Sequence, residues 1–264
     1  MTSTTEISTQ TDNEFLAELA SQAKAAAAKE RPDLARVSTR AGILAYNGEA
    51  IKGNKLQCVI VGMAYENAYY IDEFDADNPK NPACFAVATD DEGMQPHPVV
   101  PIKFNQLDKG PAPAADCSGC WAAQWKSDPS GGKGKACKQK RRLLLLPTDA
   151  LESPEAVRKA ELAVLTLPVM SVKNYSKYVN GLAAQGNLPP WAVITEVSTA
   201  PNVKSQFTVE LNAVKPITDV AVLKAIRARQ EEFDSLITLP FEAYVETPEE
   251  EKAAPAAKKA SKKF

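Results

Sequence analysis

Residues 117–146 combine a cysteine pair, a basic run and a leucine run, and they are the most informative part of the sequence. They read Cys-Ser-Gly-Cys-Trp, then a polar, glycine-rich loop, and then Gly-Lys-Gly-Lys-Ala-Cys-Lys-Gln-Lys-Arg-Arg-Leu-Leu-Leu-Leu. Two cysteines separated by two residues can present two thiolates from one tight turn, which Gly119 permits. Cys137 supplies a third thiol, and the four leucines at the end are typical of a buried strand. The stretch therefore predicts a zinc-stapled loop that presents positive charge from a β-scaffold.

The composition limits the classes of protein to consider. The chain has 264 residues, is 44% apolar and 24% charged, and carries a net charge of −2, which suits a soluble globular protein of one or two domains. No apolar run approaches the roughly 20 residues that span a bilayer, and the first residues lack the pattern of a secretory signal. We therefore expect a cytoplasmic protein without membrane contact, whose five cysteines are metal ligands or reduced thiols rather than disulfides.

The metal hypothesis needs four ligands in a tetrahedron. The Cys-x-x-Cys pair and Cys137 supply three, and the fourth is either Cys84 or His97, with the softer thiolate favoured. Cys58 lies in an apolar run and is predicted to be a core thiol. A redox pair and unliganded thiols are the alternatives, although a redox pair normally opens a helix. Four protein ligands leave no position for water, so the predicted zinc is structural, with one ion per chain.

The basic run, which is the lysine- and arginine-rich stretch at residues 133–142, is the second candidate site. Its cations are suited to phosphate backbones, and nearby aromatic rings could stack on the bases of a single strand. The alternatives are a solvated charge cluster and, for one of the two tryptophans near the cysteine turn, packing in a small satellite core over the metal. The candidate nucleic-acid-binding residues are Lys133, Lys135, Lys138, Lys140, Arg141, Arg142, Trp121, Trp125 and Tyr69.

Motifs for catalysis are missing from the sequence. The glycines and lysines of residues 131–135 do not have the spacing of a nucleotide-binding loop, and there is no Gly-x-Ser-x-Gly motif. With a single histidine, most acid–base catalysis by imidazole is excluded. We therefore predict that the protein is not an enzyme.

The pattern along the chain predicts a mostly β fold with flanking helices (α+β). Residues 1–35 form an N-terminal tail and a helix (15–29), 36–240 form one domain with a zinc insertion at about 75–142, and 241–264 form a disordered charged tail. Strands are expected at 42–48, 55–63, 68–74, 142–146, 163–168, 191–198 and 205–214, with a turn at 65–67. Helices are expected from Ser171 to Gly186 and from Thr218 to about Leu236.

Several of these motifs occur together in a known family. They are Pro82-Ala-Cys-Phe, the Cys-x-x-Cys pair, Gly-Lys-Gly-Lys-Ala-Cys-Lys before Arg-Arg and four leucines, and Leu-Pro-Val-Met-Ser at 167–171 before a helix with two tyrosines. Over about residues 40–215 the chain resembles tailed-bacteriophage single-stranded DNA-binding proteins. The resemblance implies an oligonucleotide-binding (OB)-like antiparallel barrel with a zinc insertion. It also implies Cys84, Cys117, Cys120 and Cys137 as the metal ligands.

The function that this resemblance implies is binding of single-stranded DNA, without sequence specificity, in phage replication or recombination. The expected place is the host cell cytoplasm, with other phage replication proteins or a host protein as further partners. The alternative is a phage protein-interaction module that docks on a host nucleic-acid enzyme, in which case the basic run would meet an acidic protein surface.

Overall fold

The computed structural model describes residues 34–71, 82–98 and 116–238, together with residue 19. The predicted N-terminal helix and charged tail lie outside these residues. The described part is a mixed α+β fold built on one nine-stranded sheet, in the order β3-β2-β1-β7-β6-β4-β8-β9 with β5 paired to β4. The strands are β1 (Ala35–Ser38), β2 (Ala45–Tyr46), β3 (Glu49–Ala50), β4 (Lys55–Tyr69), β5 (Cys84–Ala88), β6 (Cys137–Pro147), β7 (Ala163–Leu167), β8 (Val193–Asn202) and β9 (Gln206–Pro216). The helices are α2 (Pro154–Lys159), α3 (Val172–Gly186), α4 (Val220–Ala228) and α5 (Gln230–Ile237). The predicted α+β class is confirmed at this level.

The sheet curls into an open half-barrel. The strand pairs are antiparallel except β1 with β7. The amide of Asn54 donates to the carbonyl oxygen of Gly42 and to Thr199 Oγ1, which ties the end near β1 to β8. Helix α3 packs on the inner side, where Tyr175, Tyr178 and Leu182 join a core of strand residues that includes Cys58. Cys58 is thus a core thiol, as predicted.

A second apolar layer covers the outer side of the central strands. Val59 and Leu144 pack there against α4 and α5, which contribute Ile226 and Phe233 among others. Helix α2 adds the fully buried Val157 to the same cluster. The four-leucine run divides its side chains between the layers, because successive residues of a strand face opposite sides. This two-sided burial explains the continuous apolar run in the sequence.

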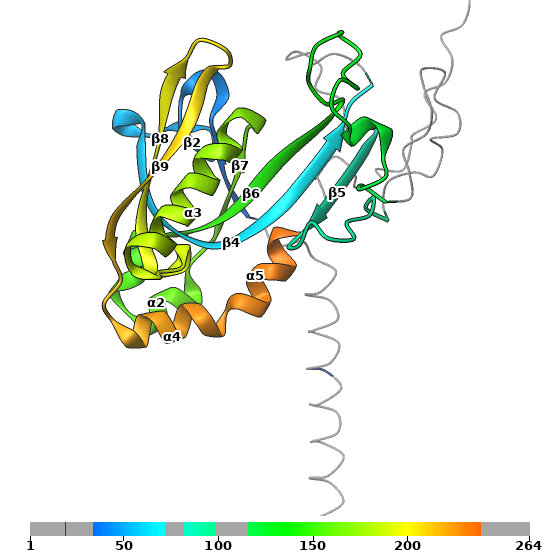
Figure 1. The fold of residues 1–264 in the computed structure, drawn as a ribbon. Coiled ribbons are helices and arrows are strands. Elements are labelled where there is room, and N and C mark those ends of the chain that lie inside the picture. Colours follow the sequence, from blue (N-terminus) through cyan, green and yellow to red (C-terminus); the bar gives the residue numbers. More distant parts are fainter. Residues whose placement is uncertain (1–18, 20–33, 72–81, 99–115, 239–264) are drawn as a thin grey trace, which may run out of the picture.

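Strand β4 is one uninterrupted strand, so the predicted turn at residues 65–67 is wrong. It pairs with β6 along nearly its whole length, from Cys58 opposite Pro147 to Tyr69 opposite Cys137. The outer part of the pair, residues 64–69 and 137–142, projects from the curled half-barrel, which we call the barrel (Figure 1). In this outer part, β5 pairs with the edge of β4 that faces away from β6. We call this three-stranded extension the arm. The polar pair Glu66 and Asn67 that suggested a turn is buried in it.

A β-bulge in β4 marks where the barrel passes into the arm. Ile60 pairs with Leu145 and Gly62 with Leu144, so Val61 is an extra residue with no partner in β6. Before the bulge Ile60 belongs to the inner core, and after it Met63 does. The bulge therefore changes which alternate residues of β4 face α3.

Other element boundaries differ from the prediction in detail. Helix α3 begins after Ser171, but the Ser171 hydroxyl accepts a hydrogen bond from the Val209 amide instead of capping the helix. The final helix is divided at Arg229 into α4 and α5, and Asp219 caps α4. The two predicted strands after α3 are present as β8 and β9, with bounds shifted by one to four residues. Of the predicted strand at 42–48 only β2 is a strand, and of that at 68–74 only the first two residues belong to β4, while 72–74 are outside the described residues. Among the described residues, no helix is long and apolar enough to cross a membrane.

Candidate metal centre and nucleic-acid interface

The Cys-x-x-Cys turn is shaped by the aspartate that precedes it. Asp116 Oδ1 accepts hydrogen bonds from the Gly119 amide and the Ser118 hydroxyl, both at 2.7 Å. The bond from Gly119 is the main reason why the pKa of Asp116 is lowered, and that from Ser118 adds to it. The Cys117 amide donates to the Met94 carbonyl at 2.9 Å, which fixes the turn against the segment that follows β5. The local chain thus presents both thiols from a defined turn.

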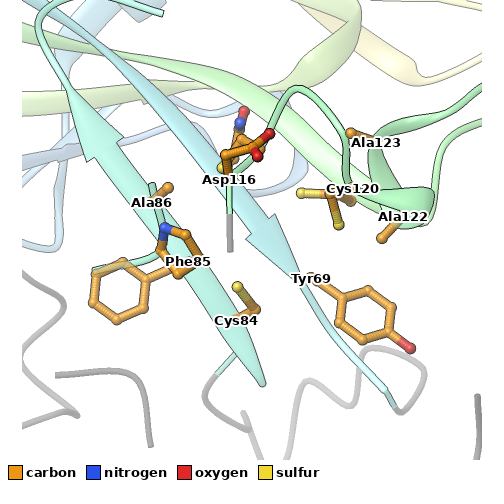
Figure 2. Close-up of a pocket in the computed structure, with 12 residues that line it drawn as sticks. Tyr69, Cys84, Phe85, Ala86, Asp116, Cys120, Ala122 and Ala123 are labelled. Carbon is orange, nitrogen blue, oxygen red and sulfur yellow. The ribbon is translucent and has the colours of Figure 1, made fainter. Parts of the chain in front are cut away.

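Strand register brings the other two cysteines to the same place. Tyr69 of β4 is opposite Cys84 on one side and Cys137 on the other, and residues that pair in register face the same side of a sheet. All four predicted ligands line one cavity with a volume of about 20 Å³, room for about one water-sized sphere. Figure 2 shows Cys84, Tyr69 and Cys120 around this cavity. The structure therefore places the four predicted ligands around one cavity.

The electrostatics of the thiols reflect their closeness. Burial raises the pKa of Cys84 to about 12, with added repulsion from Cys117 and Cys120. Burial also raises the pKa of Cys137 to about 12, and the other three cysteines add to the effect. Cys84 and Cys137 are therefore protonated at neutral pH in the absence of a cation, and all four cysteines are free rather than disulfide-bonded.

The fit to a metal is one of chemistry more than of closed geometry. Among residues 34–71, 82–98 and 116–238, no three His, Cys, Asp or Glu side chains form a group that could hold a metal ion as they stand. The donor set nevertheless suits zinc, since four thiols around one small cavity match a Cys₄ structural site. The imidazole of His97 stacks on the Phe85 ring, with centroids 4.9 Å apart, and does not line the cavity. This arrangement favours Cys84 over His97 as the fourth ligand.

A small apolar cluster surrounds the cavity, and we call the unit formed by residues 69–71, 82–86 and 116–137 the cysteine module. Tyr69, Ala122 and Ala136 are buried in it beside Cys84 and Cys120. The ring of Trp121 packs edge-on against Tyr69, with centroids 5.5 Å apart. Trp121 therefore occupies the satellite-core position expected for one tryptophan, and Tyr69 is buried instead of exposed for stacking.

The loop between the cysteines has its own internal framework. The Lys126 amide donates to the Gly134 carbonyl at 2.9 Å, and the Ser127 hydroxyl accepts from the Ala136 amide. Asp128 binds Lys138 Nζ at 2.7 Å, an ion pair that with the hydrogen bonds from Ser130 lowers the pKa of Asp128 to about 2. Lys138 therefore acts within the loop and is not freely available to a ligand.

Trp125 stands out on this framework because its side chain is 73% exposed. Lys135 Nζ lies 5.1 Å from the centre of its ring and donates to Gln139 Oε1. Lys126 and Lys133 are exposed on the same loop. Lys126 was absent from the sequence-based candidates, although its position directly after an aromatic residue is a usable signal. An exposed indole among three lysines is the most distinctive surface of the module.

The remaining cations of the run divide between the two sides of the arm. Arg142 is only 6% exposed and binds Glu66, which is fully buried, at 3.0 Å; it also donates to the Ile237 carbonyl. Lys140 lies 3.9 Å from the other carboxylate oxygen of Glu66 and over the ring of Tyr70. Both cations therefore neutralise the buried carboxylate of Glu66. Arg141 faces the opposite side, with its guanidinium carbon 3.9 Å from the centre of the Tyr65 ring.

Comparison with known proteins adds no relative: no family model, no curated protein and no solved structure matches this chain.

Proposed function

We propose that this protein binds single-stranded DNA without sequence preference, with the loop of the cysteine module as its primary contact. The observation that carries the proposal is the exposed Trp125 ring, which has Lys135 over it and stands with the exposed Lys126 and Lys133 on a loop braced by its own hydrogen bonds. An exposed indole presents a large apolar surface to water, and a binding partner would cover it. Every nucleobase has a flat aromatic face that can stack on the indole, whatever the sequence. The lysines would neutralise the phosphates on either side of a stacked base.

The proposal includes a structural zinc ion held by Cys84, Cys117, Cys120 and Cys137. When bound, the ion would neutralise the thiolates and cross-link β5, β6 and the loop. The cysteine module has few buried apolar residues of its own, so such a cross-link would fix the position of Trp125 relative to the arm. The role of the four side chains is to hold the loop, and no chemical step is assigned to them.

The curled sheet supports the proposal at the level of architecture. An OB-like barrel is an open Greek-key barrel whose exposed strands and loops bind oligonucleotides. The described sheet is compatible with such a barrel in its curl and in its mostly antiparallel pairing. The phage origin and a role in replication or recombination rest on the resemblance of the cysteine and basic motifs alone.

A fluorescence titration with a labelled oligothymidine tests the proposal. The affinity is expected to fall with salt, with a slope of log K against log salt of about −0.7 for each phosphate neutralised. Trp125→Ala is expected to weaken binding by about 1–3 kcal/mol, whereas Trp125→Phe, which keeps an aromatic ring, should lose much less. Lys224→Gln removes one positive charge from the exposed side of α4, outside the proposed binding loop, and should bind like the wild type. Binding no tighter than that of an unrelated lysine-rich protein, or binding insensitive to salt, would contradict the proposal.

A further inference from the structure

The two sides of the arm use the same basic sequence differently. In β6, Lys138, Lys140 and Arg142 face one side and Gln139 and Arg141 the other, because alternate residues of a strand face opposite sides. On the first side the cations are bound within the chain, Lys138 to Asp128 and the other two to Glu66. The basic run is thus divided between the two sides of the arm: Lys138, Lys140 and Arg142 form ion pairs within the chain on one side, and Arg141 lies on the other.

Arg141 on the second side is held flat against an aromatic ring. Tyr65 is its direct partner in β4, and the 3.9 Å separation between the guanidinium carbon and the ring centre is that of a stacked pair. A guanidinium stacked by one face keeps its second face for another planar group. Nη1 of Arg141 already donates to the Lys140 carbonyl at 3.0 Å, and the other N–H groups of the guanidinium remain as donors for phosphate oxygens. Tyr65 and Arg141 are both only partly buried, so the pair is reachable from solvent.

The side that carries Arg141 leads to Trp125. Lys135, which lies over the Trp125 ring, is hydrogen-bonded to Gln139, and Gln139 is two residues before Arg141 on the same side of β6. Two residues of a strand span about 6.6 Å, so Arg141 lies roughly one such step beyond the Gln139–Lys135 contact. Trp125 and Arg141 therefore belong to one continuous surface.

We propose that a single strand bound at Trp125 continues along this side of the arm to Arg141, where the guanidinium on Tyr65 forms a second subsite that stacks a base and contacts a phosphate. This inference rests on the proposed function and goes beyond it in giving the strand a path and in excluding the side with Lys140 and Arg142. Its ligand class is a single-stranded polynucleotide at least long enough to reach both subsites.

An acidic residue borders the second subsite. Asp91 lies three residues after Ala88, the partner of Tyr65 in β5, which places its carboxylate near the guanidinium. Burial lowers the pKa of Arg141, and the negative charge of Asp91 acts in the opposite direction. Asp91 is exposed in the turn after β5. A phosphate arriving at Arg141 meets this charge, so Asp91 weakens binding at the second subsite.

Three substitutions in the full-length protein test this path, with labelled oligothymidines titrated at several salt concentrations. Arg141→Gln is expected to weaken binding by about tenfold and to reduce the salt slope by about 0.7, the value for one phosphate. Lys140→Gln, its neighbour on the other side, should cause a clearly smaller change in both. Asp91→Asn should strengthen binding several-fold, and Glu155→Gln on α2 is its charge-matched control, expected to bind like the wild type.

The outcomes separate this inference from the proposed function. If the wild type does not bind, the proposed function fails. If the wild type binds but Arg141→Gln and Lys140→Gln have equal effects, or Asp91→Asn does not strengthen binding, the path is wrong and the proposed function stands. Arg141→Lys is a more conservative variant that controls for misfolding, because it keeps the positive charge and replaces only the planar guanidinium. It should have the same salt slope as the wild type but bind more weakly, since an ammonium group cannot stack on a base. A Lys variant with wild-type affinity would overturn the stacking part of the proposal.

Discussion

The barrel and the cysteine module are stabilised by different means, although β4 and β6 run through both. The barrel has two apolar layers in which leucine, isoleucine, valine and phenylalanine are fully buried on either side of the sheet. The cluster around the cavity of the cysteine module is instead formed by two buried cysteines, two alanines and one tyrosine, and Phe85, which lines the same cavity, is a large fully buried side chain. At about 25 cal/mol per Å² of buried apolar area, this smaller set of mostly small side chains provides less stabilisation than the two layers of the barrel.

The difference indicates how the two regions depend on each other. The barrel has the large core of an independently stable unit, whereas the cysteine module resembles small domains that need a metal or disulfides to remain folded. The arm joins the barrel to the proposed binding loop, which the module stabilises with less apolar burial than the barrel has. Four measurements would test this contrast.

Removal of the metal should produce the largest effect, and only in the module. Structural zinc contributes an apparent free energy of about 10–16 kcal/mol to small metal-dependent folds. Cys137→Ser is expected to reduce zinc from about one ion per chain to a small fraction and to make the loop near Trp125 sensitive to proteases, while the barrel keeps its thermal transition. Elemental analysis and limited proteolysis measure these effects.

Cys58→Ala is the control for this experiment, because Cys58 is buried in the barrel core and should affect stability without affecting zinc content. Zinc that is retained in Cys84→Ser but lost in His97→Ala would show that the ligand assignment is wrong. Zinc absent from the wild type would contradict the metal proposal.

Removing the Arg142 side chain should cause the next largest loss of stability. The loss should extend to the barrel, because Arg142 also donates to the Ile237 carbonyl at the end of α5. The substitution Arg142→Ala removes the closest partner of the fully buried Glu66 and leaves only Lys140, at 3.9 Å; breaking a buried ion pair typically costs about 3–5 kcal/mol. Chemical denaturation measures the loss of unfolding free energy. Replacing both residues, as Glu66→Leu with Arg142→Met, should recover most of it, and Arg158→Ala on the exposed surface of α2 should cost very little. A cost below about 1 kcal/mol for Arg142→Ala would mean that the pair does not couple the arm to α5.

A smaller effect is expected in the barrel from Tyr178→Phe. The Tyr178 hydroxyl is 2.5 Å from Thr195 Oγ1, and both residues are buried. Losing this bond should cost about 1 kcal/mol because the Thr195 hydroxyl keeps its burial but loses a partner. Thermal unfolding measures the change. Zinc content should be unchanged, and a variant that lost zinc would contradict the separation of the two regions.

The smallest effect should come from Asp128 and should depend on pH. Its pKa is lowered to about 2, mainly by the hydrogen bond from Lys138, against about 3.9 in an unfolded chain. The charged carboxylate therefore stabilises the loop fully above about pH 4, and the stabilisation is lost as the pH falls toward 2. Hydrogen exchange in the loop should be faster in Asp128→Asn than in the wild type at neutral pH, with the difference vanishing near pH 2. A difference that grew on acidification would contradict this ion-pair explanation.

The sequence was informative where a pattern has a direct local cause. The spacing of Cys117 and Cys120 predicts a shared turn, and the leucine run of β6 predicts a buried strand; both are seen in the structure. Helix α3 and strands β7, β8 and β9 were predicted from their apolar residues and are present, and each buries apolar side chains in the core.

The errors occur where a partner distant in the sequence decides the outcome. Glu66 and Asn67 have the polarity of a turn, but Glu66 accepts a hydrogen bond from Arg142 and Asn67 donates one to the sulfur of Met94, and these contacts allow β4 to continue. Arg142 itself looks like the last member of a phosphate-binding run, although its carboxylate partner lies 76 residues earlier. Local polarity does not reveal such pairings, so the division of the basic run between two sides of the arm could be found only in three dimensions.

The bulge at Val61 gives β4 one residue more than the strand with which it pairs, and this sets which side chains meet in the arm. Because Val61 has no partner, Ala64 pairs with Arg142, Tyr65 with Arg141 and Glu66 with Lys140. If β4 instead paired regularly after Ile60, with Val61 opposite Leu144, every later residue would move by one position, and Glu66 would lie opposite Gln139, on the side that carries Arg141. The separation of the buried carboxylate from the solvent-facing arginine therefore depends on a count of residues as much as on their identity.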